Sequence, residues 1–160
     1  MTASAQLRRA SRAVVQTWNA TPERLLPLLT PLGEKAWAVG WEPEMRWQAP
    51  GRGEGTLFVT RSVDGGETVW VLETFDVVGL RVAYVHLSPG SLVVEISVAL
   101  APLSESRTRA EVRYTFTALS ERGNAWLAER EADFSDFMRD WERELNHFLQ
   151  TGQKLDAPSK

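Results

Sequence analysis

The chain has 160 residues, a formal net charge of −3 and no cysteine. Hydrophobic residues make up 43% and charged residues 24%, which is the balance of one globular domain with a sizeable core. The absence of cysteine excludes disulfides, thiolate nucleophiles and cysteine-bound metals, and the acidic balance without a basic stripe argues against a nucleic-acid partner.

The N-terminal stretch MTASAQLRRASRAVVQTW has no apolar core followed by a small-residue cleavage pattern, so we expect no secretory signal. No stretch approaches the roughly 18 uninterrupted apolar residues that a membrane-spanning helix needs. These features, together with the missing cysteines, indicate a cytoplasmic protein that does not insert into a membrane.

The N-terminal quarter predicts a strand followed by two short helices. Residues 11–18 are rich in β-branched side chains, which favour a strand. The pair Thr-Pro then occurs twice, at Thr21 and at Thr30. Threonine caps a helix and proline fits its first position, so we expect short helices over residues 23–29 and 31–38.

From Trp41 onward the apolar residues recur with a period of two, which predicts strands separated by short turns. Six strands are expected, over residues 41–47, 56–62, 68–75, 80–87, 92–100 and 109–117. None of the connections can hold a crossover helix, so the strands predict a continuous antiparallel meander. In the last two strands the apolar and polar residues alternate, so we expect one buried and one solvated face.

The C-terminal stretch FSDFMRDWERELNHFL carries apolar side chains at helical spacing and predicts a long helix. The helical pattern extends back to Ser120, with an interruption expected at Gly123-Asn124, and Gly152 is a suitable C-cap. The apolar stripe of this helix can cover the apolar face of the sheet. Residues 142–144 are expected to form a charged, solvated flank.

These elements predict an α+β fold in which a curved antiparallel sheet of about seven strands wraps around a long C-terminal helix. In this order of elements the chain resembles the START-like or Bet v 1-like helix-grip superfamily (SRPBCC), which includes polyketide cyclases, lipid-transfer domains and Hsp90-activator-like proteins. Five stretches resemble a bacterial branch of unknown function: GWEPEM, GGETVWVLETFD, SPGSLVVEISVAL, YTFTALSERGNAWL and WERELNHFLQTG. The resemblance implies a single helix-grip domain over residues 1–152, followed by a polar tail over residues 153–160.

The resemblance also implies a cavity between the sheet and the C-terminal helix, with its mouth at the short helices and hairpin tips. Such a cavity would take a small apolar or amphipathic ligand of the lipid, polyketide or aromatic type, without a cofactor. The candidate ligand-binding residues are Trp37, Trp41, Trp70, Arg81, Tyr84, His86, Tyr114, Phe137, Met138 and Trp141. Ordinary core packing is the competing interpretation for the helix residues, and a hydrophobic plug is the competing interpretation for Trp37 and Trp41.

The direction of three polar side chains depends on the strand register. Regular pairing places Arg81 on the apolar face, where a buried guanidinium would need a carboxylate or an anionic ligand. A bulge would turn it to solvent, which is the interpretation that we favour. The same regular pairing points Tyr84 and His86 away from the core, whereas a bulge would bring them into the cavity beside Trp70. A lone histidine is a poor metal ligand, so no metal site is predicted.

Three functions follow from these observations. The leading hypothesis is a ligand-binding domain that encloses a small apolar molecule and is either non-enzymatic or carries an enzymatic activity without a recognisable motif. An enzyme of the polyketide cyclase, aromatase or hydratase type is the first alternative, and it would need at least two polar groups that converge inside the cavity. A protein-partner module is the second, and it would show an exposed apolar patch on the outer sheet face. The polar outer residues of 109–117 argue against this alternative. A homodimer through an edge strand is left open.

Overall fold

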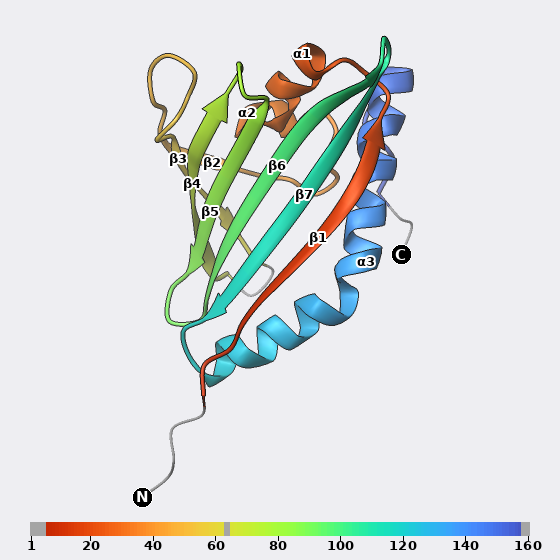
Figure 1. Cartoon of the computed structure of the whole chain (residues 1–160). Helices are drawn as coiled ribbons and strands as arrows, with labels where there is room; N and C mark the ends of the chain where they lie inside the picture. Colours follow the sequence, from red (N-terminus) through yellow and green to blue (C-terminus); the bar gives the residue numbers. More distant parts are fainter. Residues whose placement is uncertain (1–5, 63–64, 158–160) are drawn as a thin grey trace, which may run out of the picture.

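The computed structural model describes residues 6–62 and 65–157. Residues 1–5 of the predicted domain and 158–160 of the predicted tail lie outside this part. The elements are β1 (Arg9–Trp18), α1 (Pro22–Leu25), a 3₁₀-helix η1 (Leu26–Leu29), α2 (Pro31–Glu34), β2 (Glu44–Trp47), β3 (Leu57–Arg61), β4 (Glu67–Asp76), β5 (Arg81–Ser88), β6 (Leu92–Ser104), β7 (Arg107–Ala118) and α3 (Glu121–Thr151). Figure 1 shows their arrangement. The predicted order and type of the elements are confirmed.

The seven strands form one antiparallel sheet in the order β1-β7-β6-β5-β4-β3-β2. Strands β2 to β7 make the predicted meander, and β1 pairs with β7 along its whole length, from Arg9 opposite Thr117 to Trp18 opposite Thr108. The sheet is curved, and all helices lie on its inner side (Figure 1). This arrangement is the predicted α+β helix-grip layout.

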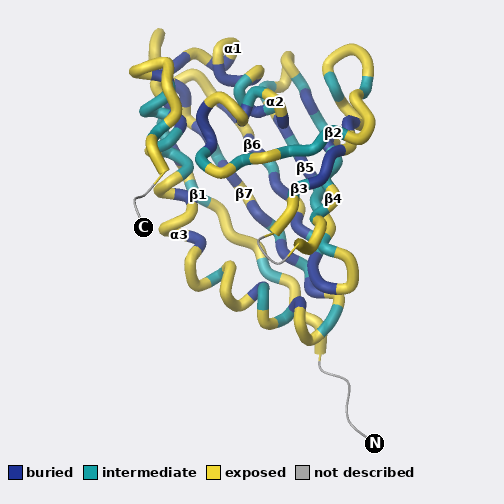
Figure 2. Tube along the Cα trace, turned by 180° about the vertical axis from the view of Figure 1, so that it is seen from behind, coloured by how far each residue is buried: buried dark blue, intermediate teal, exposed yellow. Residues whose placement is uncertain are grey.

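The helices cover different parts of the inner face. Helix α3 packs mainly on β1, β7 and β6. Helices α1 and α2 lie at the opposite end of the molecule from the N-terminus, near the upper ends of β4 to β6 in the orientation of Figure 1. The N-terminal half of α3 is largely exposed, whereas its C-terminal half is more deeply packed (Figure 2). The space beside the C-terminal half of α3 is therefore enclosed from three sides.

The register between β5 and β6 differs from the regular pairing expected from the sequence. Tyr84 lies opposite Ile96 and His86 opposite Val94, so both side chains face inward, whereas Arg81 lies opposite Ala99 on the exposed outer face. The reason is the turn: Ser88 pairs with Leu92 across three loop residues, and a three-residue loop reverses the faces relative to a two-residue loop. No bulge between β5 and β6 is needed for this arrangement.

Helix α3 is continuous, and the expected interruption at Gly123-Asn124 does not occur. Its N-cap is Ser120, whose hydroxyl accepts from the Gly123 N–H, and its C-cap is Gly152 in the left-handed region at φ 75°. Gly123 does not interrupt the helix; it allows close packing. A Cβ at this position would lie 1.8 Å from the Ser91 carbonyl oxygen, so the glycine permits a close approach of the helix to the β5–β6 turn.

Helix α2 is shorter than expected, because regular helical structure ends at Glu34. The following residues 35–43, called the strap below, form turns and irregular backbone that lead to β2. Gly40 in the strap has a φ of 77°, which a glycine adopts without strain. The strap runs back over the inner side of the sheet and forms one wall of the site described next.

Candidate ligand cavity

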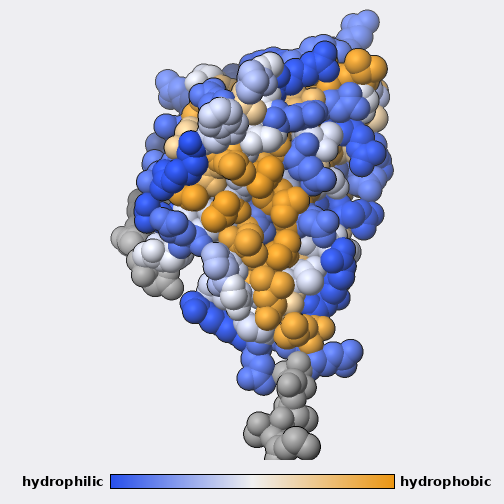
Figure 3. Space-filling model, turned by 90° about the vertical axis from the view of Figure 1, so that its left-hand side faces the viewer, coloured by the Kyte–Doolittle hydropathy of each residue, from blue (hydrophilic) through white to orange (hydrophobic). Residues whose placement is uncertain are grey.

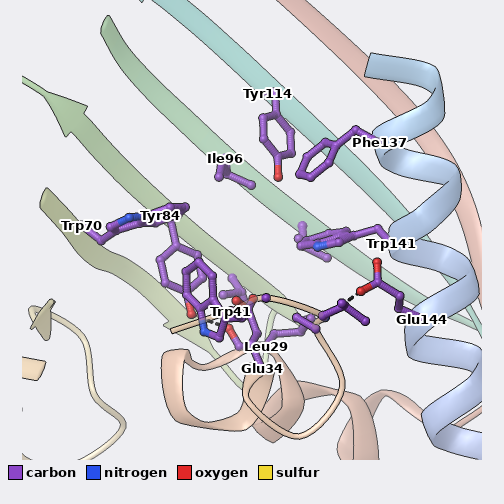
Figure 4. Close-up of a pocket in the computed structure, with 15 residues that line it drawn as sticks. Leu29, Glu34, Trp41, Trp70, Tyr84, Ile96, Tyr114, Phe137, Trp141 and Glu144 are labelled. Atoms are coloured by element: carbon purple, nitrogen blue, oxygen red, sulfur yellow. Dashed lines mark hydrogen bonds between the residues drawn. The ribbon is translucent and has the colours of Figure 1, made fainter. Parts of the chain in front are cut away.

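A cavity of about 160 Å³ lies between the inner face of the sheet, the strap with α2, and the C-terminal half of α3. Its aromatic walls are Trp41, Trp70, Tyr84, Tyr114, Phe137 and Trp141 (Figure 4). Its polar side chains, apart from the tyrosines and tryptophans, are Glu34 and Glu144. An apolar cavity of about 150 Å³ is large enough for benzene, so this cavity has room for a molecule with one substituted ring.

The strap is tied to both neighbouring helices. The backbone N–H of Val39 donates to Glu144 Oε1 at 2.6 Å, which connects the strap to α3. The indole N–H of Trp41 donates to the Pro31 carbonyl at 2.9 Å, which connects it to α2. The Trp41 ring also meets the Trp70 ring edge to face, with the centroids 5.2 Å apart. These contacts close the cavity on the side of the strap.

Three hydrogen bonds join the end of β1 to α3 and thereby position Trp141. Gln16 donates its side-chain N–H to the Met138 carbonyl at 2.7 Å, and the Thr17 N–H donates to Glu142 at 2.9 Å. Asn146 donates to the Thr17 carbonyl at 2.9 Å. The Trp141 ring extends from α3 toward the sheet (Figure 4), and its N–H has no hydrogen-bond acceptor among the described residues.

The prediction that residues 142–144 form a solvated flank is wrong for Glu142 and Glu144. Both are partly buried and accept backbone N–H groups, Glu142 from Thr17 and Glu144 from Val39. Only Arg143 between them is exposed. Burial raises the pKa of Glu144, and the hydrogen bond from Val39 opposes that rise. A charge pattern in the sequence does not show which carboxylates will meet unpaired backbone donors.

Glu34 is the most unusual side chain of the cavity. It is only 8% exposed, and its carboxyl group has neither a hydrogen bond nor an ion pair among the described residues. Burial raises its pKa well above the ordinary value of a glutamate. Figure 4 shows it at the floor of the cavity, beside Trp41 and Tyr84. A buried carboxyl without a partner is costly and is often found at functional sites.

The two tyrosines of the cavity differ in their hydrogen bonds. The Tyr84 hydroxyl donates to the Leu29 carbonyl at 2.5 Å, which fixes η1 against β5. The Tyr114 hydroxyl has no partner among the described residues and points into the cavity (Figure 4). Burial raises the pKa of both tyrosines, and the nearby Glu34 raises it further. Both hydroxyls therefore stay protonated over the physiological range.

His86 lies on the inner face but behind Trp70, outside the cavity lining. Its ring stacks on Trp70 with the centroids 4.1 Å apart, and its Nδ1 is buried with no hydrogen-bond partner in the described part of the chain. Burial, with a smaller contribution from the Arg130 charge, lowers the pKa of His86 to about 4. The ring is therefore neutral near pH 7. It does not reach the cavity as the acid or base that the sequence left open.

The structure brings six of the ten predicted site residues together around the cavity: Trp41, Trp70, Tyr84, Tyr114, Phe137 and Trp141. Trp37 and Met138 are fully buried in the core behind them, and Arg81 lies on the opposite face of the sheet. Sequence reasoning missed Glu34 and Glu144. Glu34 precedes Lys35, and the two look like an ordinary solvated pair within an otherwise apolar stretch, so the sequence held little signal for its burial.

The outer face of the sheet is not uniformly polar, contrary to the expectation from the last strands. Outward-facing residues of β3, β4 and β5 form an apolar stripe, of which Leu57, Val69 and Leu87 are the most exposed members. Figure 3 shows a continuous orange stripe on this side of the molecule. The polar outer residues of β7 lie in another part of the sheet, separated from β5 by β6. This is the kind of surface that the protein-partner alternative would require.

No family model matches the chain, and no curated protein matches it significantly. Solved structures do resemble it. A Rhizobium loti protein is 18% identical, with a TM-score of 0.62 over 88% of this chain and 100% of the other. Norcoclaurine synthase from Thalictrum flavum, in complex with dopamine and hydroxybenzaldehyde, is 10% identical, with a TM-score of 0.64 over 96% and 91%. The Zhui aromatase/cyclase from a Streptomyces species is 12% identical, with a TM-score of 0.63 over 94% and 100%.

These likenesses show the fold, which is the Bet v 1-like helix-grip fold that the sequence predicts. Neighbours with this fold include enzymes and proteins without an assigned activity, so the fold is compatible with ligand binding and does not specify a ligand. Within the described part of the chain, no helix is long and apolar enough to cross a membrane.

Proposed function

We propose that this protein binds a small aromatic or amphipathic molecule in the cavity between the sheet, the strap and α3. The observation that carries the proposal is the aromatic-walled cavity of about 160 Å³ with polar atoms that have no hydrogen-bond partner among the described residues. Binding would come mainly from burial of the ligand ring, and Glu34, Tyr114 and the Trp141 N–H would fix its orientation.

The size of the cavity favours one ring over a lipid or a polyketide chain. Drug-sized ligands and long apolar chains need several hundred cubic ångströms, which is more than this cavity offers. The norcoclaurine synthase structure with the same fold contains dopamine and hydroxybenzaldehyde, which are both small aromatic molecules. This likeness supports the proposed size class of the ligand.

Native mass spectrometry of the purified protein, combined with thermal shift assays of single-ring aromatic compounds, tests the proposal. A small mass retained only in the native spectrum, or a compound that raises the melting temperature, is the expected result. Ile96 points into the cavity (Figure 4), so Ile96→Phe should fill it and weaken binding while the fold is kept.

Two tryptophans of α3 provide a matched pair for the same assay. Trp141→Ala should weaken binding, because it removes a cavity wall. Trp126→Ala should leave binding unchanged, because Trp126 packs beneath Arg122 near the N-terminal end of the helix. If no compound binds the native chain and no mass is retained, the cavity is only a packing defect and the proposal is wrong.

An acid–base enzyme is the second candidate, because Glu34 and Tyr114 both face the cavity and neither polar group has a hydrogen-bond partner among residues 6–62 and 65–157. A carboxyl group with a raised pKa can transfer protons near neutral pH. The test is the exchange of the methyl protons of acetophenone in D₂O, followed by NMR. Exchange faster than in buffer, and lost in Glu34→Gln, would support catalysis. An unchanged rate would leave the protein a binder.

A further inference from the structure

Apart from the tyrosines, the ionisable side chains that line the cavity are acidic. Its lining contains two carboxyl groups, Glu34 from α2 and Glu144 from α3, and no lysine, arginine or histidine. The adjacent Lys35 is exposed and does not line the cavity. Glu144 already accepts the Val39 N–H, whereas the Glu34 carboxyl group has no hydrogen-bond or ion-pair partner in the described part of the chain. The protein therefore presents a buried carboxyl group to any molecule that enters.

We infer that the ligand of this cavity is a small aromatic amine that binds as a cation, with its ammonium group held by the carboxylate of Glu34. The inference rests on the proposed function, since it names the ligand class of the same cavity. An ammonium group supplies both the opposite charge and three N–H donors, which is what an isolated buried carboxylate lacks. An anionic ligand would instead meet two carboxyl groups without a compensating cation.

The aromatic side chains beside Glu34 favour the same kind of ligand. The rings of Trp41 and Trp70 meet edge to face at 5.2 Å, and those of Trp70 and Tyr84 at 6.0 Å. An aromatic ring that turns its face to a pocket attracts a cation electrostatically, most strongly when water is excluded. Phe58 at 5.5 Å and His86 at 4.1 Å cover the two faces of Trp70. The rings available as flat apolar walls for the ligand are therefore Trp41, Tyr84 and Trp141. The cavity thus combines one carboxylate with an aromatic enclosure.

The titratable groups that face the cavity are Glu34 on α2, Tyr84 on β5, Tyr114 on β7 and Glu144 on α3. Both tyrosines remain protonated at neutral pH, since burial and Glu34 raise the pKa of each. Burial also raises the pKa of Glu34 in the empty cavity, so a bound cation should displace the proton of this carboxyl group. A neutral ligand would leave that proton in place.

Isothermal titration calorimetry with three compounds of nearly equal size tests the inference: benzylamine, benzyl alcohol and benzoate. We expect benzylamine to bind at least about tenfold more tightly than benzyl alcohol, because a close charge pair in a buried site contributes substantially to affinity. Benzoate should bind most weakly. In buffers of different ionisation enthalpy, benzylamine but not benzyl alcohol should show proton release.

Two variants connect these results to Glu34. Glu34→Gln should lower the affinity for benzylamine to that for benzyl alcohol and abolish proton release, while benzyl alcohol binding stays nearly unchanged. Glu95→Gln removes the same charge from the exposed outer side of β6. It should change neither the affinity for benzylamine nor the proton release. If Glu34→Gln leaves benzylamine binding intact, the carboxylate does not hold the ammonium group and the inference is wrong.

The outcomes separate this inference from the proposed function. If benzyl alcohol binds and benzylamine binds no more tightly, the cation inference fails and the proposed aromatic-ligand cavity stands. A preference for benzoate would also overturn the inference while supporting the cavity. If none of the three compounds binds, and native mass spectrometry shows no retained molecule, both proposals are wrong.

Discussion

Glu34 contributes to how the stability of the ligand-free protein depends on pH. Its carboxyl group is buried and has no partner among the residues that the structure describes, so the folded state favours the protonated form and the pKa of Glu34 is raised. The unfolded chain ionises this group near its ordinary pKa of 4.5. Above that pH the unfolded state releases the proton more readily than the folded state. The stability contribution of Glu34 is thus fully present below pH 4.5 and is lost as the pH rises through the folded-state pKa.

Glu34→Gln should therefore raise the free energy of unfolding at neutral pH. Glutamine has a similar shape and cannot ionise, so the variant escapes the cost of ionising the buried carboxyl group at pH 8, which is about 1.4 kcal/mol for each unit by which burial raises the pKa. The gain should shrink toward pH 4. Urea denaturation at both pH values measures it, and Glu95→Gln on the outer face should have little effect at either. A gain of the same size at both pH values would show that Glu34 is not buried as a titrating group.

A substitution at Glu34 that stabilises the protein but weakens binding would indicate that the carboxyl group is there for function. If Glu34→Gln makes the protein more stable and less able to bind an amine, the carboxyl group is kept at the expense of stability. His86, whose pKa is also displaced by burial, provides a contrast. It lies behind Trp70 and outside the cavity lining, and no ligand that fits the cavity would contact it directly.

At the scale of single elements, α3 depends on how closely its first turn approaches the β5–β6 turn. The Leu119 N–H donates to the Ser91 carbonyl at 2.7 Å, and Gly123 lies against the same carbonyl. The glycine lets the helix begin directly after β7 and continue without a break to Gly152. Helix propensity alone would favour alanine at this position, so packing outweighs local preference here.

Gly123→Ala should destabilise the protein although alanine is the better helix former. The added Cβ would lie 1.8 Å from the Ser91 oxygen, so the helix or the turn must shift. We expect a net loss of about 1–3 kcal/mol, as for other overpacked sites. Urea denaturation of the variant measures the loss, and Ala125→Ser on the exposed side of the same turn is the control. Unchanged stability would mean that the helix and the β5–β6 turn can move apart at little cost.

The strap is the element on which the cavity most depends, and it has little regular structure of its own. It is held by the Val39–Glu144 hydrogen bond and by the Trp41 contacts with Pro31 and Trp70. These connect it to α3, α2 and β4. The N–H groups of residues 35–38 and of Trp41 bond to carbonyls three or four residues earlier, so among the described residues the strap is not paired with the sheet through its backbone. A segment held by such local bonds opens more readily than the paired strands around it. We therefore regard the strap as the entry side of the cavity.

For the whole molecule, the order of elements could be predicted because each has a local signal. The two Thr-Pro pairs mark the short helices, the period of two marks the strands, and Gly152 marks the end of α3. The faces of β5 could not be predicted, because they depend on the conformation of a three-residue turn. A shift of one residue moved Arg81 outward and Tyr84 into the cavity.

The candidate site was predictable only where large aromatic residues share the inner face. Tryptophans at 37 and 41 look equivalent in the sequence, yet one is core and the other is a cavity wall, because the strap turns between them. Glu34 could not be recognised, since the burial of a charged side chain depends on tertiary packing by α3 and the sheet. Patterns along the chain indicate faces, whereas unfilled space between elements is a property of the whole fold.

Ligand binding should protect the elements that line the cavity more than the elements that lie away from it. A bound molecule would touch Trp41, Trp70 and Trp141, which belong to the strap, β4 and α3, whereas β1 lies away from the cavity. Hydrogen exchange with saturating benzylamine, followed by mass spectrometry, should therefore show slowed exchange in residues 38–41. Strand β1 should change little beyond the global stabilisation that any ligand gives.

The variant Glu144→Gln sharpens this experiment. The glutamine side chain can still accept the Val39 N–H, but the hydrogen bond is weaker because the acceptor carries no negative charge. The backbone amide hydrogens of the strap should therefore exchange faster in the ligand-free variant than in the unmodified protein. Saturating benzylamine should restore much of the protection, because the ligand would contact the strap from inside. If saturating ligand slows exchange equally throughout the chain, the strap is not the mobile wall of the cavity. If it slows β1 and leaves residues 38–41 unchanged, the ligand binds elsewhere.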